Sequence, residues 1–298
     1  RSSIEFPRII APFYSNSRTR RDSQGRRIRR RRFYSTPLTM AKVSADIIRR
    51  PGYYKMHVNS GEWTYRWQTS ENSRHEFSPI VVKYHYMNTT SDMMDSMMIE
   101  NPYLMGLMED YCIPEMRYTY TYTSPADYLN PIRWEVTLTE AANLMSLGMM
   151  ALGKGKWQDL NKKLFKTPYS QFLKLETDFA KIWALNQQSQ LVGHANFGIV
   201  CNYGNSRKSP FSELFYVGGA NSIRAFPMRS VGPGCFGAVG MPRIGSYLFQ
   251  NGDMKIVMNL EYRRQLFGNL YGAIFLDAGN VWNLSTDVGT GDKDTDDF

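Results

Sequence analysis

The chain has 298 residues, 42% of them hydrophobic and 14% aromatic, so it can bury one large β domain or two smaller domains. Its longest nearly apolar stretch, Leu144–Gly153, falls far short of the ~20 residues that a membrane-spanning helix requires, which excludes a helical membrane protein. The formal net charge of +9 is local, because nine Arg and one acid between Arg18 and Arg32 contribute 9 − 1 = +8 of it.

The arginine run at residues 18–32 contains no Phe, Tyr or Trp. The run therefore has no aromatic ring on which a nucleic-acid base could stack, and we predict no nucleic-acid partner. Such a run is typical of a solvated loop or a disordered segment, and binding to acidic lipid headgroups stays open as an alternative. The chain begins with Arg1 rather than Met, so we expect it to be a truncated sequence without a leader.

From residue 80 onward, apolar and polar residues alternate along segment after segment, which is the period of a β-strand. Residues 171–185 place apolar side chains on one face and Lys174, Glu176 and Asp178 on the other. The apolar faces of further segments are Ile80, Val82, Tyr84 and Tyr86; Met116, Tyr118, Tyr120 and Tyr122; Ile132, Trp134, Val136 and Leu138; Leu191, Ala195, Phe197 and Ile199; Met254, Ile256, Met258 and Leu260; and Leu270, Ile274 and Leu276.

Two insertions interrupt this rhythm, at Ser91–Pro114 and Ala141–Pro168. Both are rich in Met and Leu, and each has helical spacing over one or two turns. A Met stripe of this kind is more often local packing than a partner groove, so we predict ordered loops.

The alternating segments number about ten and run for roughly 7 to 14 residues, where a tilted strand that crosses a bilayer takes about 9 to 11. Strands of a soluble sandwich are typically shorter, and Tyr and Trp at many strand ends suggest interfacial girdles. We predict an all-β fold: a transmembrane antiparallel β-barrel. Residues 1–38 are assigned to an N-terminal strand and basic loop, and residues 39–298 to a partial barrel truncated at both ends.

The loop between Tyr203 and Asp253 is longer than a passive connection needs to be. Its centre reads Gly218-Gly219-Ala220-Asn221-Ser222-Ile223-Arg224-Ala225-Phe226. This pattern resembles the BamA/TamA family of outer-membrane proteins (bacterial surface antigens), in which a long extracellular loop folds into the barrel lumen. That loop has a V/I-R-G-F/Y tip behind a Gly pair, and a neighbouring inward-facing strand carries F-x-D-x-G, which Phe275-Leu276-Asp277-Ala278-Gly279 resembles.

The two motifs lead to one hypothesis about the site. An Arg that enters a lumen needs a carboxylate partner, and alternation places Asp277 on the polar face, so we predict an Arg224–Asp277 ion pair. Glu261 and Lys255, on the polar face of the adjacent strand, could extend this network. The family's third tip residue is usually Gly, and its replacement by Ala225 predicts a negative φ at that position.

Enzyme chemistry is not predicted. Residues 232–237 match G-x-G-x-x-G but follow no buried parallel strand and open no helix, so they indicate a loop and not a dinucleotide-binding site. The four His and three Cys residues have no metal-ligand spacing, and no G-x-S-x-G elbow occurs. Acids and His194 on polar faces fit a wet lumen better than acid/base catalysis. We expect no cofactor and no metal.

The resemblance implies a fragment of a 16-stranded barrel in the outer membrane of a Gram-negative cell, where it inserts or translocates proteins. A TamA-like member is one form it could take. The implied partners are unfolded outer-membrane protein clients, outer-membrane lipids and periplasmic or accessory assembly proteins. Two alternatives stay open: a passive porin-like barrel, which has no reason to couple a folded loop to a strand Asp, and a soluble β-rich binding domain, which predicts a dry interior between sheets.

Overall fold

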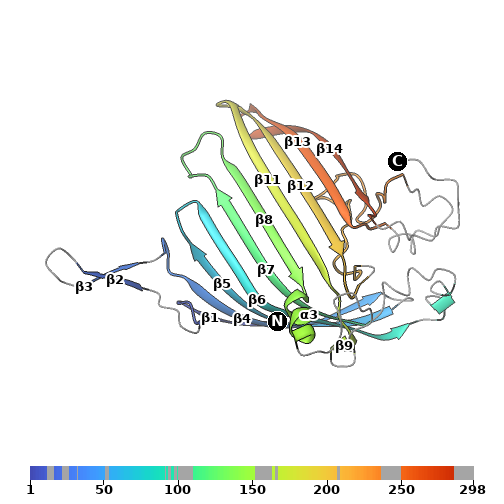
Figure 1. Cartoon of the computed structure of the whole chain (residues 1–298). Coiled ribbons are helices and arrows are strands. Elements are labelled where there is room, and N and C mark those ends of the chain that lie inside the picture. The colour runs from blue at the N-terminus through green and yellow to red at the C-terminus, as the bar shows by residue number, and fades with distance from the viewer. Residues whose placement is uncertain are drawn as a thin grey trace.

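The computed structural model describes residues 1–11, 17–21, 27–31, 33–50, 54–90, 92, 95–96, 99, 110–151, 163–164, 167–206, 209–235 and 250–284. In these residues the chain forms one large, curved antiparallel sheet of ten strands (Figure 1). The elements are β1 (Ser2–Phe6), β2 (Ser17–Arg21), β3 (Arg27–Arg31), β4 (Leu38–Arg50), β5 (Tyr54–Gln68), β6 (Ser73–Thr90), β7 (Tyr111–Thr123), β8 (Ile132–Ala141), α3 (Asn143–Ala151), β9 (Lys163–Leu164), β10 (Thr167–Pro168), β11 (Phe172–Asn186), β12 (Ser189–Asn202), β13 (Met254–Phe267) and β14 (Leu270–Trp282).

The strands follow one another through the sheet in chain order, β1-β4-β5-β6-β7-β8-β11-β12-β13-β14, with β1 and β14 at its edges. Two excursions leave it: the β2–β3 hairpin between β1 and β4, and α3 with the β9–β10 pair between β8 and β11. This up-and-down order is the connectivity of a membrane barrel wall. The fold prediction is confirmed, including its number of strands.

The two faces of the sheet differ in chemistry as the alternation predicts. The outer face is apolar and exposed, and its members with more than a third of their surface exposed include Val43, Ile47, Ile80, Val82, Tyr118, Trp134, Leu138, Leu173, Phe179, Met258, Leu260, Ile274 and Leu276. The inner face carries ion pairs such as Arg66–Glu76 and Lys83–Glu115. Apolar outside and polar inside is the pattern of a lipid-facing wall, and it is the reverse of a soluble sandwich.

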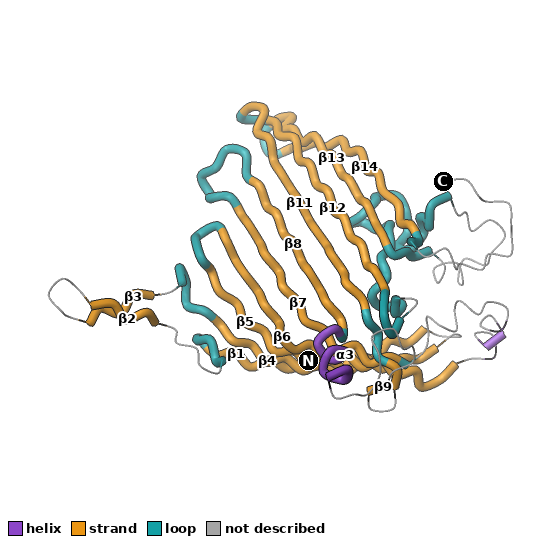
Figure 2. Tube along the Cα trace, in the orientation of Figure 1, coloured by secondary structure: helices purple, strands orange, loops and turns teal. Residues whose placement is uncertain are grey.

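The two ends of the sheet also differ (Figure 2). The β5–β6, β7–β8, β11–β12 and β13–β14 connections are short turns and lie at one end. The β6–β7, β8–β11 and β12–β13 connections are long and lie at the other. The helical spacing predicted in the second insertion is confirmed by α3. Most of the first insertion lies outside the described residues, and β7 begins within it, at Tyr111.

No helix in the described part of the chain is long and apolar enough to cross a membrane. A buried apolar cluster sits at the end with the long connections, where Ile113, Phe172, Val200, Val257 and Val281 are at most 4% exposed. Part of the β12–β13 connection completes this cluster. A packed apolar core therefore lies where that loop meets the sheet.

Candidate functional site

The connection between β12 and β13 is described at residues 203–206, 209–235 and 250–253, and this described part, which we call the lumenal loop, folds onto the inner face of the sheet. It has its own backbone pairing, because Phe215 exchanges two hydrogen bonds of 2.9 Å with Gly252 and Val217 forms a bridge with Val231. Val217 and Ile223 are 0% and 5% exposed and join the apolar cluster. The loop is thus a packed element of the fold rather than a solvated connection.

At the tip of the loop, Arg224 binds two carboxylates. Its Nε and Nη2 donate to the two oxygens of Asp277 at 2.8 and 2.7 Å, and its Nη1 donates to Glu261 at 2.6 Å. The backbone N–H of Arg224 also donates to Asp277, at 3.0 Å. Bidentate pairing of this kind fixes orientation as well as distance. The structure therefore brings together the Arg and Asp that the two motifs predicted, with Glu261 as a third member.

The hydrogen bonds that the Arg224 guanidinium donates to Asp277 and Glu261 raise its pKa above its usual range. The side chain of Asp277 is only 4% exposed, and that of Arg224 is 27% exposed. Removal of the guanidinium would therefore leave a nearly buried carboxylate without its main partner.

The three inward positions of Phe275-Leu276-Asp277-Ala278-Gly279 each serve the loop. The guanidinium of Arg224 lies 3.7 Å from the centroid of the Phe275 ring, which is close enough for a cation–π interaction. A Cβ at Gly279 would come within 2.6 Å of the Ile256 carbonyl oxygen and 3.2 Å of Ile223 Cδ1. Gly279 therefore leaves room for the side chain of Ile223, the residue before Arg224.

The Gly pair shapes the approach to the tip. Gly218 has φ = 108°, and a Cβ there would lie 2.1 Å from the carbonyl oxygen of Pro227, so only Gly fits. The N–H of Gly219 donates to the carbonyl of Phe226 at 2.8 Å and closes the turn that contains Arg224. The Phe226 side chain itself is 52% exposed and does not enter the cluster.

The prediction of a negative φ at Ala225 is wrong. Its φ is 69°, in the left-handed region that favours Gly. The hydrogen bonds of Arg224 and Gly219 on either side of the tip dictate the path of the backbone, and the Cβ of Ala225 is carried in a strained conformation. The tip thus adopts a backbone conformation that favours Gly although it carries Ala.

Sequence reasoning missed Glu213, which anchors the other side of the loop. Its carboxylate accepts from Lys83 of β6 at 2.7 Å and from Lys174 of β11 at 3.3 Å, and Lys83 also bonds Glu115 of β7 at 2.8 Å. Burial alone would raise the pKa of Glu213, but the two ammonium groups lower it to about 2. The available signal was an acid in a mostly apolar segment, Pro210-Phe211-Ser212-Glu213-Leu214-Phe215.

Two further polar groups complete the anchoring. Asn259 of β13 donates from Nδ2 to the Ser222 carbonyl at 2.7 Å and to Asp277 at 2.9 Å, and so joins loop and wall. Lys255, predicted to extend the Arg224 network, instead lies with its Nζ 5.1 Å from the Phe215 ring centroid. Lys174 approaches the same ring at 4.7 Å.

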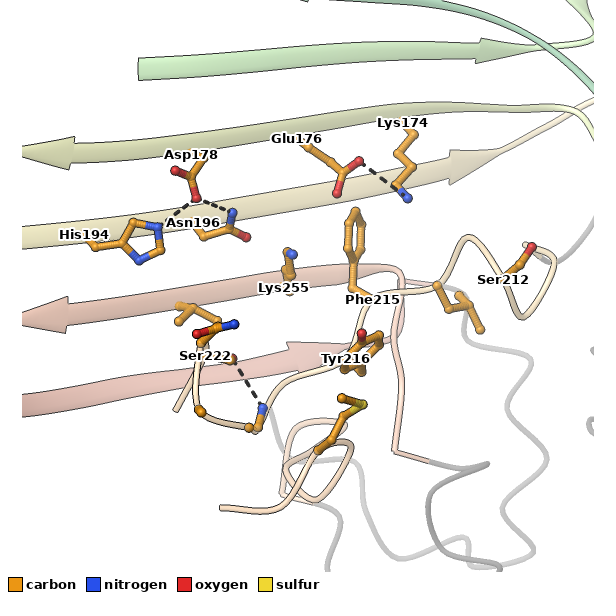
Figure 3. A pocket seen from close by; sticks show the side chains of 17 residues that line it. Lys174, Glu176, Asp178, His194, Asn196, Ser212, Phe215, Tyr216, Ser222 and Lys255 are labelled. Atoms are coloured by element: carbon orange, nitrogen blue, oxygen red, sulfur yellow. Dashed lines mark hydrogen bonds and ion pairs between the residues drawn. The ribbon is translucent and has the colours of Figure 1, made fainter. Parts of the chain in front are cut away.

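Between loop and wall lies a cavity of about 640 Å³ that is lined by both polar and apolar side chains (Figure 3). His194 of β12 and Asp178 of β11 face it, with His194 Nε2 2.7 Å from Asp178 and Nδ1 2.9 Å from Asn259. Asn196 donates to the same Asp178 oxygen at 2.9 Å. These side chains form a network among themselves, which is the arrangement of a hydrated lumen.

Comparison with known proteins agrees with this architecture. The Omp85 superfamily domain matches residues 115–298, more than half of the chain. Sorting and assembly machinery component 50 homolog A of Xenopus laevis is 35% identical over 88 residues, which are 28% of this chain and 18% of that protein. The Xenopus tropicalis homolog is 35% identical over 82 residues, 26% of this chain and 17% of its own length.

Among solved structures, BamA from Haemophilus ducreyi lacking POTRA domains 1–3 superimposes with a TM-score of 0.54 at 12% sequence identity. The superposition covers 83% of this chain and 46% of that one, so the chain spans less than half of the proteins it matches. The fold is shared over most of the sheet, and the family match contains both the loop tip and its carboxylate partners. The chain belongs to the Omp85 superfamily of outer-membrane β-barrel proteins.

Proposed function

We propose that the protein inserts or translocates other proteins at the outer membrane, as a factor of the BamA/TamA type. The observation that carries this proposal is the lumenal loop anchored through Arg224 to Asp277 and Glu261. The match to the Omp85 superfamily and the relatives named as sorting and assembly machinery components support it. The Gram-negative source stays a prediction, since those relatives come from the genus Xenopus.

The proposed mechanism is physical rather than chemical. A weakly paired seam in the complete barrel would offer a strand edge on which an unfolded outer-membrane protein client grows by β-augmentation. The anchored loop would hold the adjoining part of the wall in one shape. The expected partners are such clients, membrane lipids and accessory assembly proteins.

The alternative is a passive porin-like barrel. The lumenal loop argues against it, because a packed element that includes buried Val217 and Ile223 occupies one end of the lumen. A conducting pore instead needs an open, water-filled channel through its whole length. Porins provide no reason for the Arg224 site.

A charge-swap cycle in the full-length protein tests the proposal: Arg224→Asp, Asp277→Arg and both together. The readouts are heat-modifiable barrel folding and the rate at which vesicles containing the protein fold an unfolded β-barrel client. We expect both single variants to lose client folding and the double variant to recover part of it. Swapping Arg66 and Glu76, an inner-face pair on β5 and β6, is the matched control and should leave client folding intact.

Silent single variants would overturn the role of the Arg224 site. A wild-type protein that conducts ions steadily and does not accelerate client folding would place the porin alternative first.

A further inference from the structure

The β2–β3 hairpin has an unusual distribution of charge. Its ten paired residues include seven arginines, and the register sets Arg18 opposite Arg30 and Arg21 opposite Arg27. Like charges directly opposite one another destabilise an antiparallel pair. A two-stranded ribbon is also only marginally stable by itself. Anions bound along the hairpin would offset this repulsion.

The hairpin is attached at a defined level of the barrel wall. On its incoming side, the Tyr65 hydroxyl donates to the Ile10 carbonyl at 2.9 Å. On its outgoing side, the Tyr34 N–H donates to the Gln68 carbonyl at 2.9 Å. Both attachments are to the end of β5 that leads into a short turn, so the hairpin leaves the sheet at the end opposite the lumenal loop (Figure 1).

An aromatic row runs across the wall at the same level. Trp67 stacks on His75 with ring centroids 5.4 Å apart, His75 lies 5.1 Å from Tyr120, and Tyr120 lies 6.5 Å from Trp134. Phe33, just after the arginine run, continues the row at 6.5 Å from Trp67.

The row belongs to the outer, lipid-facing side. Trp67 is in register with His75, which is in register with Tyr120, and these positions share a face with Tyr118 and Trp134, which are 37% and 44% exposed. Aromatic residues gather on barrels at the depth of the lipid headgroups. The base of the hairpin is thus held at headgroup depth.

We propose that the β2–β3 hairpin binds the phosphate groups of anionic phospholipids in the leaflet on the short-turn side of the membrane. Anionic lipids supply the counter-charge that the opposed arginines require, at the depth where the hairpin is attached. Arginine is suited to phosphate because its planar guanidinium can bind two oxygens at once. A nucleic acid is the weaker candidate, since residues 18–32 contain no aromatic ring for base stacking.

The test uses the full-length protein in lipid nanodiscs, which leave both sides of the bilayer accessible. Trypsin cleavage within residues 18–31 is followed by mass spectrometry in discs of phosphatidylcholine, with and without phosphatidylglycerol. Cleavage after Lys163, which is exposed at the opposite end of the sheet, is the internal control. We expect phosphatidylglycerol to slow cleavage of the hairpin at least about tenfold relative to Lys163, and high salt to abolish this protection because it screens charge within about 3 Å at 1 M.

Two matched variants separate charge from folding. Changing Arg18, Arg20, Arg29 and Arg30 to Gln should remove the lipid-dependent protection, since each cationic residue near an anionic surface contributes about fivefold in affinity. The Gln variant loses those trypsin sites, so its remaining cleavage at Arg21, Arg27 and Arg31 is compared. Changing the same four residues to Lys should keep most of the protection. Unchanged heat-modifiable mobility in both variants shows that the barrel still folds.

Equal cleavage of the hairpin in the two kinds of disc would overturn the proposal. So would equal protection of the Gln and Lys variants. Protection by a single-stranded oligonucleotide or an acidic peptide in phosphatidylcholine discs, without any effect of phosphatidylglycerol, would assign the hairpin to another polyanion and reject the lipid.

Discussion

Ala225 carries backbone strain at the tip of the lumenal loop. Its φ of 69° places the Cβ near the following carbonyl, a conformation that costs an L-residue about 1 kcal/mol relative to Gly. We expect Ala225→Gly to stabilise the protein by about 1 kcal/mol, measured as a shift in the urea midpoint of barrel unfolding. Ala220→Gly is the matched control, because Ala220 is not among the described residues with positive φ. A Gly there relieves no strain, and it lowers the free energy of unfolding by increasing the conformational freedom of the unfolded chain.

The opposite result would have a clear meaning. If Ala225→Gly destabilises the protein as much as Ala220→Gly does, the tip does not adopt the left-handed conformation and the strain argument fails.

Glu213 is expected to keep its charge over the range of pH in which most proteins work. Its ordinary pKa of 4.5 falls to about 2 in the folded protein, because Lys83 and Lys174 favour the carboxylate more than burial disfavours it. A lowered pKa means that its contribution to stability is complete above about 4.5 and is lost as the pH falls toward about 2. Glu115, bonded to the same Lys83, shares the site.

Hydrogen exchange of the lumenal loop checks this expectation. The difference in loop protection between the wild type and Glu213→Gln, corrected for the intrinsic effect of pH on exchange, should stay constant from about pH 8 to about pH 5, because Glu213 stays charged over that range. Glu213→Gln, which mimics the protonated acid, should lower protection across the whole range. If the protection of the wild-type loop fell to that of Glu213→Gln as the pH dropped from about 7 to about 6, the lowered pKa of Glu213 would be contradicted.

Some of these residue contacts could be predicted and others could not. Alternation placed Asp277 on the polar face and the motif placed Arg224 in the loop, so their meeting followed from two local observations. Glu213 and Lys83 are 130 positions apart, and no local pattern indicates which strand the acid will reach. The φ of Ala225 is set by the packing of its neighbours, whereas the sequence suggests only what an isolated Ala prefers.

At the scale of elements, β8 separates its two faces clearly. Leu138 is 44% exposed on the outer face, whereas the adjacent Thr137 points inward and bonds Thr119 of β7 at 3.0 Å. A cation on the lipid face of a barrel costs about 2 to 4 kcal/mol near the bilayer centre, and a lumenal one costs much less. We therefore expect Leu138→Arg to destabilise the barrel by about 2 kcal/mol more than Thr137→Arg.

Urea unfolding in lipid vesicles measures this difference. Equal effects of the two arginines, or a neutral Leu138→Arg, would mean that the outer face is in water and that the exposed apolar band is not a membrane surface.

The boundaries of β6 show why strands were predicted better in their middle than at their ends. In the first part of β6 the outward-facing residues have odd numbers, such as His75 and Phe77. In the second part they have even numbers, such as Ile80 and Val82. A register shift between Ser78 and Val81 inverts the alternation. A period-two pattern cannot be followed across such a bulge, so only the segment from Ile80 was recognised from sequence.

At the scale of the whole molecule, the lumenal loop connects two distant parts of the wall. Glu213 reaches β6 and β11 on one side, and Arg224 reaches β13 and β14 on the other. Between these two anchors lie Val217 and Ile223, which are buried in the apolar cluster. The loop is therefore a brace across the inner face, and its position depends on both ion-pair sites and on the shared core.

This arrangement predicts how the two anchors combine. In Glu213→Gln or Asp277→Asn alone, the other anchor and the buried core should keep the loop on the wall, so the rate of loop cleavage by an added protease rises modestly. With both changes, the core alone must hold the loop, and cleavage should rise by more than the product of the two single effects. The pair Arg66→Gln and Glu76→Gln, remote from the loop, controls for general weakening of the barrel. If the double variant is cleaved at the product of the single rates, the anchors act independently and the loop does not brace the wall as one unit.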